Sequence, residues 1–129
     1  LLGPDQRLEI QASAGVWALA DPASLDQILQ NLVSNARDAM GPQGTLRISA
    51  GRHSGDVRLE VRDDGSGIPA HQLEHLFDPF YTTKPSGTGL GLATVRNLVL
   101  QNHGTIQVES QPGRGTIFTI DLPAPDGTP

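Results

Sequence analysis

Residues 21–40 read DPASLDQILQNLVSNARDAM, and this stretch predicts the longest helix of the chain. Asp21 is a favoured N-cap residue, and Pro22 occupies the first helical position, where its missing N–H group costs nothing. The apolar residues then recur at three- and four-residue spacing until Gly41-Pro42 ends the pattern. They are Leu25, Ile28, Leu29, Leu32, Val33, Ala36 and Ala39. A helix with one apolar face has to bury it, so the remaining chain must supply a second layer.

Short alternating runs on both sides of this helix predict strands. Upstream, residues 8–10 and 16–20 read as two strands around a turn at Gly15. Downstream, residues 45–50 and 57–61 read as a hairpin, and residues 105–109 and 116–122 as two closing strands. Residues 70–76 and 92–102 read as helices. This order predicts an α/β (α+β) two-layer sandwich, a mixed sheet of about five strands with about three helices on one face.

Composition predicts one domain and narrows the classes of function. The chain has 129 residues, of which we assign 1–123 to the domain and 124–129, rich in Pro, Asp and Gly, to a tail or linker. A formal net charge of -5 argues against a nucleic-acid partner. The absence of cysteine excludes a disulfide scaffold and suits the cytoplasm. No apolar run has membrane-spanning length, although a longer parent protein could still carry an anchor.

Three polar residues share one strip at the shoulder of the long helix: Asn31, Asn35 and Asp38. Asparagine is a poor helix former, so two of them one turn apart are more informative than one. Their amide oxygens are hard ligands that suit Mg²⁺, especially when phosphates complete the coordination. The alternative interpretation is polar decoration at the edge of the core.

Two glycine-rich segments are further candidates for a ligand site. Asp63 follows the predicted strand 57–61 and begins DDGSGI; its carboxylate could accept a hydrogen bond from the amino group of adenine, which guanine lacks at that position. The stretch 84–92, KPSGTGLGL, precedes a helix, so its backbone N–H groups could bind an anion. It is neither a P-loop nor a dinucleotide fingerprint. Taken alone, a turn explains the first segment and a flexible loop the second equally well.

In this order, the segments resemble the GHKL superfamily of ATP-binding domains, and its histidine kinases most closely. LDQILQNLVSNARDAM at 25–40 is similar to the N box, and DDGSGIP at 63–69 to the first glycine box. LFDPFYTTK at 76–84 is similar to the F box, GTGLGLA at 87–93 to the second glycine box, and GRGTIFTIDLP at 113–123 to the closing strand. The Thr-Thr-Lys variant resembles nitrogen-regulatory and some hybrid kinases.

The resemblance implies a Bergerat-type fold that binds ATP and Mg²⁺. It implies that Asn35 is the Mg²⁺ ligand, with Asn31 possible beside it, and that Asp63 binds the adenine amino group. Asn31, Asn35 and Lys84 would be the catalytic residues, and 77–91 would be a lid over ATP. The other nucleotide-binding residues that it implies are Asp38, Gly65, Gly67, Ile68, Phe80, Thr82, Thr83, Gly87, Thr88, Gly89, Leu90, Gly91 and Thr116.

Asn31 separates the kinases from the ATPases of the superfamily. The ATPases carry a glutamate there as general base, and a neutral amide cannot take the proton. The resemblance therefore implies transfer of the γ-phosphate to a histidine on a separate dimeric helical hairpin of the same parent protein, with a response regulator downstream. None of the four histidines here has the acceptor's sequence context. We expect an isolated monomer that binds ATP without hydrolysing it efficiently; the alternatives are a nucleotide-sensing module without transfer and a GHKL ATPase.

Overall fold

The computed structural model describes residues 2–13, 18–81 and 91–125. Several residues considered above lie outside the described residues: Gly15, the first two residues of the predicted strand 16–20, Thr82, Thr83, Lys84, Gly87, Thr88, Gly89 and Leu90. The same holds for the last four residues of the predicted tail.

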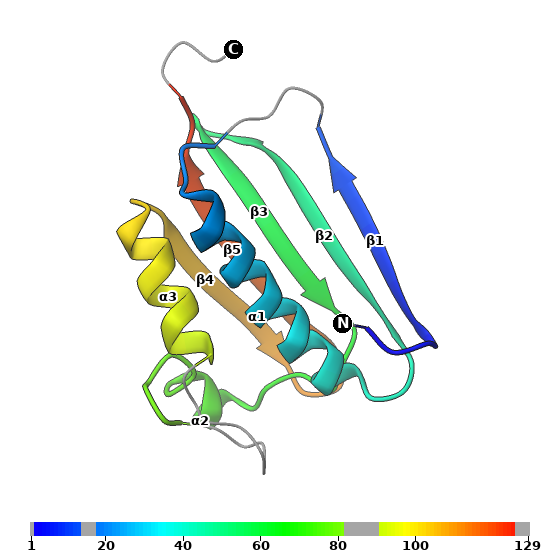
Figure 1. The fold of residues 1–129 in the computed structure, drawn as a ribbon. Helices are drawn as coiled ribbons and strands as arrows, with labels where there is room; N and C mark the ends of the chain where they lie inside the picture. Colours follow the sequence, from blue (N-terminus) through cyan, green and yellow to red (C-terminus); the bar gives the residue numbers. More distant parts are fainter. Residues whose placement is uncertain (1, 14–17, 82–90, 126–129) are drawn as a thin grey trace.

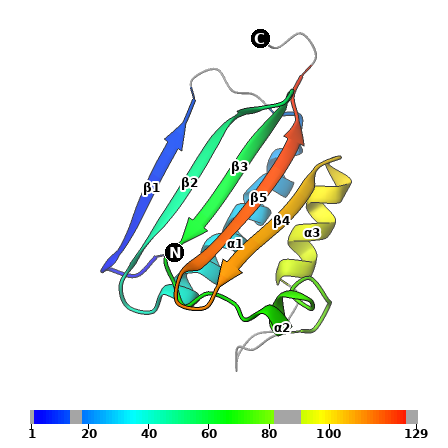
Figure 2. The same ribbon diagram turned by 180° about the vertical axis from the view of Figure 1, so that it is seen from behind.

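A five-stranded sheet forms one layer, and helices cover one of its faces (Figures 1 and 2). The elements are β1 (Gln6–Ala12), α1 (Pro22–Met40), β2 (Gly44–His53), β3 (Asp56–Asp63), α2 (Ala70–Leu73), α3 (Gly91–Gln101), β4 (Thr105–Gln111) and β5 (Gly115–Pro123). The strand order is β1-β2-β3-β5-β4. Only the β1–β2 pair is parallel, so the sheet is mixed. The predicted two-layer α/β architecture is confirmed.

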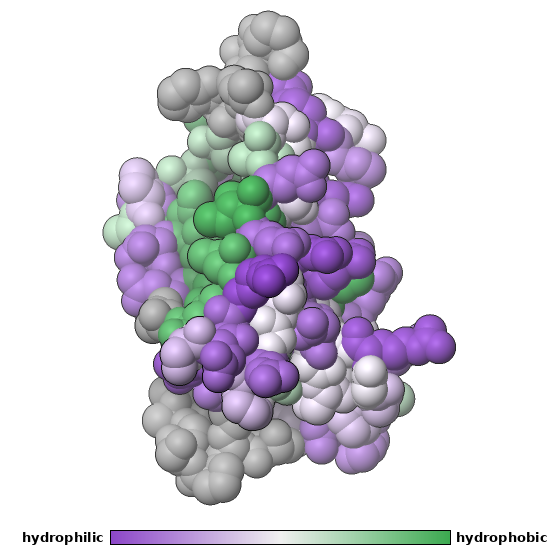
Figure 3. Space-filling model, turned by 90° about the vertical axis from the view of Figure 1, so that its right-hand side faces the viewer, coloured by the Kyte–Doolittle hydropathy of each residue, from purple (hydrophilic) through white to green (hydrophobic). Residues whose placement is uncertain are grey.

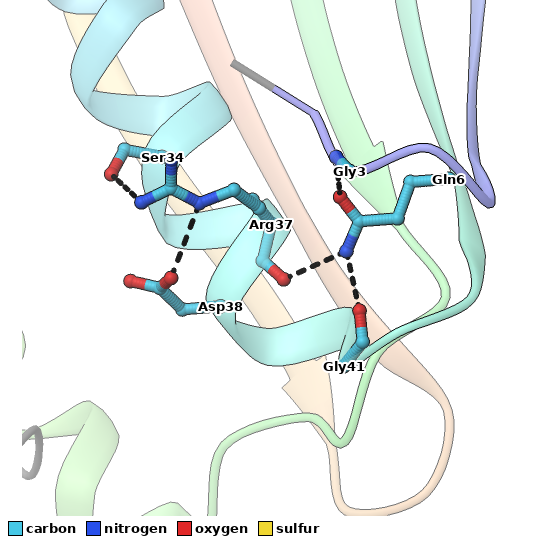
Figure 4. A network of polar contacts seen from close by, with 6 residues as sticks. All are labelled: Gly3, Gln6, Ser34, Arg37, Asp38 and Gly41. Atoms are coloured by element: carbon cyan, nitrogen blue, oxygen red, sulfur yellow. Dashed lines mark hydrogen bonds and ion pairs between the residues drawn. The ribbon is translucent and has the colours of Figure 1, made fainter.

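The long helix α1 begins and ends where the sequence predicted. The Asp21 carboxylate accepts hydrogen bonds from the backbone N–H and the hydroxyl of Ser24, both at 3.0 Å, which caps the first turn. At the other end, the Gln6 side-chain amide donates to the carbonyls of Arg37 and Gly41 (Figure 4). The start of β1 is thereby tied to carbonyls that a helix end leaves without partners.

The core lies between the helices and the sheet. From α1 it takes Ile28, Leu32, Ala36 and Met40, one residue per turn, and from α3 Val95 and Val99. The sheet contributes Leu46, Leu59, Val61, Phe118, Ile120 and Leu122. The opposite face of the sheet carries charged side chains, including the ion pair of Arg58 with Asp121, in which both N–O distances are close to 3 Å. This division between the two faces is what the alternating strand pattern predicts.

Two predicted elements differ from the structure. Residues 18–20 were expected to end a strand, but they are not in the sheet; the Leu19 N–H instead donates to the Pro123 carbonyl at 2.7 Å. The β1–β2 pair is parallel, and α1 lies in the crossover connection between these two strands. The helix predicted at 70–76 stops at Leu73, where the hydrogen bonds change to three-residue turns such as His75 N–H to Gln72.

Strand β1 forms one edge of the sheet and extends beyond the cover of the helices (Figure 1). Its large apolar side chains Leu8 and Ile10 are exposed, and an apolar surface is visible on this side of the molecule (Figure 3). In the part of the chain that the structure describes, none of the helices combines the length and the apolar character that a bilayer crossing needs.

Candidate functional site

A row of four side chains crosses the sheet where β3 ends. Leu46 on β2, Asp63 on β3, Thr116 on β5 and Ser110 on β4 are register partners, so they share the face that the helices cover. Leu46 is fully buried, and Asp63 and Thr116 are buried polar residues. Because this row changes from an apolar side chain to polar side chains on the face that the helices cover, we take it as the border between the hydrophobic core and a candidate ligand site.

The Asp63 carboxylate is buried but hydrogen-bonded. It accepts from the backbone N–H of Gly65 at 2.9 Å and from that of Thr116. Burial raises the pKa of this carboxyl above the usual value for aspartate, with a smaller contribution from Asp64, while the two N–H groups oppose the rise. A buried acceptor with a raised pKa suits a ligand that donates a hydrogen bond.

The loop after Asp63 is packed against the protein backbone on two sides. The Ser66 N–H donates to the Ala39 carbonyl at the end of α1 at 3.0 Å, and the Gly113 N–H donates to the Ser66 carbonyl at 2.8 Å. A Cβ on Gly65 would lie 2.6 Å from the Ala39 oxygen. At Gly67 the φ angle is +75°, and a Cβ would collide with the Gln111 carbonyl. Both glycines are therefore required to hold the loop beside Asp63, a role that needs no ligand.

The polar strip of α1 reaches the beginning of α3. The Asn31 side-chain amide donates to the Gly91 carbonyl at 3.3 Å, so it joins α1 to the first residue of α3. Asn35 is half-buried one turn further on, and Asp38 is exposed and pairs with Arg37 at 3.4 Å (Figure 4). Asn31 and Ala39 are separated by about 12 Å along the helix axis. One helix thus borders both the Asp63 loop and the start of α3.

The described part of the F box is anchored at its first phenylalanine. The rings of Phe77 and Phe118 meet edge to face with centroids 6.4 Å apart, which ties this segment to β5. Phe80, in contrast, is 74% exposed and has a left-handed φ of +67°. Of the predicted nucleotide-binding residues in this segment, Phe80 is the one that the structure describes, and it extends from the surface.

The structure also identifies two polar residues that sequence reasoning missed. Ser110 makes three hydrogen bonds through its hydroxyl, one of them from the backbone N–H of Ile68 at 2.8 Å. Asp64 accepts from the Thr45 N–H at 3.0 Å and so fixes the start of β2. Neither role could be recognised without the strand register. For Ser110, the signal in the sequence was a serine that follows Ile106 and Val108 in the alternation of β4, at a position where an apolar residue is expected.

The side-chain amides of α1 are the candidate metal ligands of this site. Within residues 2–13, 18–81 and 91–125, no three histidine, aspartate or glutamate side chains form a group that could hold a metal. Asn31 and Asn35 offer hard oxygen donors, a set that fits Mg²⁺ when phosphate oxygens and water complete an octahedral shell.

Known proteins resemble this chain in sequence and in fold. The model of the family "Histidine kinase-, DNA gyrase B-, and HSP90-like ATPase" matches residues 20–126. Sensor histidine kinase ZraS of Escherichia coli (strain K12) is 50% identical over 104 residues, 81% of this chain and 22% of that protein. The catalytic domain of histidine kinase ThkA superimposes with a TM-score of 0.83 at 32% identity, covering 93% of this chain and 80% of that one.

A structure of full-length ShkA in complex with AMPPNP is also similar. Its TM-score is 0.84 at 29% identity, and the match covers 96% of this chain and 27% of that one. The chain spans less than a quarter of the length of ZraS and of Sensor kinase CckA of Brucella abortus (strain 2308).

Proposed function

Because the chain belongs to the family of histidine kinase-, DNA gyrase B- and HSP90-like ATPases, we propose that it is the ATP-binding catalytic domain of a sensor histidine kinase. It binds Mg·ATP and donates the γ-phosphate to a histidine on a dimeric helical hairpin elsewhere in the parent protein. A response regulator then takes the phosphoryl group. The observation that supports this most strongly is the buried Asp63 carboxylate beside a loop fixed between α1 and the β4–β5 turn.

In this proposal, Asp63 selects the base. Its carboxylate accepts a hydrogen bond from the amino group of adenine, and guanine is disfavoured because its carbonyl would face a negative charge. Gly65, Gly67, Ile68 and Thr116 line the base pocket. Burial of the Asp63 carboxylate strengthens the preference for adenine over guanine, because a buried acceptor that faces a ligand without a donor loses binding free energy.

The phosphates lie toward the other end of the strip on α1. Asn35 would hold Mg²⁺, with Asn31 beside it and Asp38 at the border of the site; the bound ion would neutralise phosphate charge. The lid would supply Phe80, Thr82, Thr83, Lys84 and the residues 87–91, of which Lys84 contacts the terminal phosphates. The backbone N–H groups at Gly87, Gly89 and Gly91 would bind phosphate oxygens.

Asn31 favours transfer over hydrolysis. It is a neutral amide whose nitrogen already donates to the Gly91 carbonyl, so it supplies no base for water. The chain's contribution to the reaction is then positioning and charge neutralisation, and the attacking nitrogen comes from the hairpin.

Two measurements on the isolated chain test this function. Calorimetry should detect Mg·ATP binding, and a steady-state assay should detect almost no phosphate release. Phosphate release that is substantial in the wild type and lost in Asn35→Ala would instead identify an ATPase. Absence of ATP binding by the folded chain would reject the proposal altogether.

A further inference from the structure

We propose that Ser110 is a positioning residue that makes Thr116 an acceptor toward the base. Ser110 lies on β4, opposite Thr116 on β5, which in turn lies opposite Asp63 on β3. The inference deepens the proposed function and rests on it, because it concerns how the same pocket recognises adenine.

The Ser110 hydroxyl makes three hydrogen bonds. Its oxygen lies 2.8 Å from the Ile68 nitrogen, 2.9 Å from the Gly115 carbonyl oxygen and 2.8 Å from the Thr116 hydroxyl oxygen. A backbone N–H can only donate, and a carbonyl can only accept. The single hydroxyl proton of Ser110 therefore goes to Gly115, while Ile68 donates to its oxygen.

These assignments decide the direction of the third bond. Since Ser110 has no further proton to give, the Thr116 hydroxyl must donate to Ser110. The Thr116 proton is then directed toward Ser110 on β4. Toward any other partner, the Thr116 oxygen can only accept a hydrogen bond. The Asp63 carboxylate and the Thr116 hydroxyl therefore both act as hydrogen-bond acceptors toward a bound base.

Such a pocket favours an amino group over a carbonyl at position 6 of a purine. ATP offers an amino group there, and inosine triphosphate offers a carbonyl oxygen. A Thr116 hydroxyl that could rotate freely would be able to donate to that oxygen. By fixing the proton, Ser110 removes this option and so increases the discrimination against 6-oxo purines.

The same hydroxyl also anchors the loop through the Ile68 N–H. Loss of this anchor would weaken binding of every nucleotide to a similar extent, since it does not depend on the group at position 6. The ratio of the two dissociation constants therefore separates the effect on selectivity from a purely structural effect.

The experiment compares ATP and inosine triphosphate binding to the 129-residue chain by calorimetry. We expect Ser110→Ala to reduce the preference for ATP by about fivefold, the equivalent of one neutral hydrogen bond. Ser110→Thr, which keeps the hydroxyl, should restore the preference. Ser49→Ala is the matched control, because Ser49 is also a strand serine but lies with Glu9 and Arg47 in a concavity of about 530 Å³ outside this row.

Two further variants keep the test decisive if Ser110→Ala fails to fold. Thr116→Val, which has the same shape without the hydroxyl, should also reduce the preference for ATP, whereas Thr116→Ser should retain it. An unchanged ratio in folded Ser110→Ala or in Thr116→Val would overturn the inference while leaving ATP binding intact. A wild-type chain that binds neither nucleotide would contradict the proposed function itself.

Discussion

At the scale of single residues, Asp63 is the side chain on which the proposed recognition of adenine depends most. Its carboxylate is buried at the end of β3, where it accepts hydrogen bonds from two backbone N–H groups and provides a strong acceptor for a ligand. We predict that Asp63→Asn weakens ATP binding by about 10- to 100-fold, the range expected for a hydrogen bond to a charged group. Calorimetry measures this change. Asp64→Asn is the control, because an amide oxygen can still accept from the Thr45 N–H; equal losses in both variants would contradict the assignment.

The protonation of Asp63 gives a second prediction at this scale. Burial raises the pKa of the free carboxyl, so it binds a proton at a pH where an ordinary aspartate is already ionised. A ligand that donates to the ionised form must lower this pKa, and its affinity is complete above the raised pKa and lost as the pH falls through it. Carbon-13 NMR titration with and without ADP measures both values. A carboxyl pKa that stays constant or increases on binding would count against contact with the amino group.

Some residue roles could be predicted from the sequence and others could not. The position of Asp63 at the end of a strand and of Asn31 on a polar helical strip follows from local pattern. The roles of Ser110 and Gly67 depend on partners far along the chain, namely Ile68 and the Gln111 carbonyl. Such partners are set by strand register, which local sequence does not specify.

At the scale of the element, α1 was the most predictable part of the molecule. The N-cap residue, the spacing of the apolar residues and the Gly-Pro pair at the end all predict the same helix. In the structure, α1 begins at Pro22 and ends at Met40. The prediction of a strand at 16–20 was wrong for its described residues, 18–20. Alternating apolar residues satisfy a strand pattern, but in the structure these residues precede α1, the crossover helix between the parallel strands β1 and β2.

The cap of α1 can be tested separately from the site. Asp21→Ala removes the acceptor for the Ser24 N–H and should lower the free energy of unfolding by about 1 kcal/mol. Urea denaturation measures the change. Asp21→Ser retains a capping oxygen and should lose much less; the same loss in both variants would show that capping is not the cause.

At the scale of the whole molecule, one helix serves both the core and the site. Leu32 is 1% exposed and lies between Asn31 and Asn35 in the sequence. Leu32→Ala should therefore cost about 2–5 kcal/mol of stability. In the control Leu100→Ala, a side chain that is 51% exposed, the loss should be much smaller. Thermal unfolding compares the two, and similar melting temperatures would contradict the assigned core.

At the scale of the whole molecule, the proposed function requires that the phosphoryl group leave this domain. In that proposal Asn31, a neutral amide that donates to the Gly91 carbonyl, supplies no base for water, and the acceptor is a histidine on a separate hairpin.

The most direct test is a transfer assay in which the two parts are mixed. The chain is incubated with Mg·ATP labelled at the γ-phosphate and a separately prepared dimeric hairpin carrying the parent protein's acceptor histidine. We predict acid-labile label on that histidine, with little free phosphate, and no label when the chain carries Asp63→Asn at ATP concentrations that saturate only the wild type. Label that remains entirely on ATP, with both parts folded and ATP bound, would contradict the account.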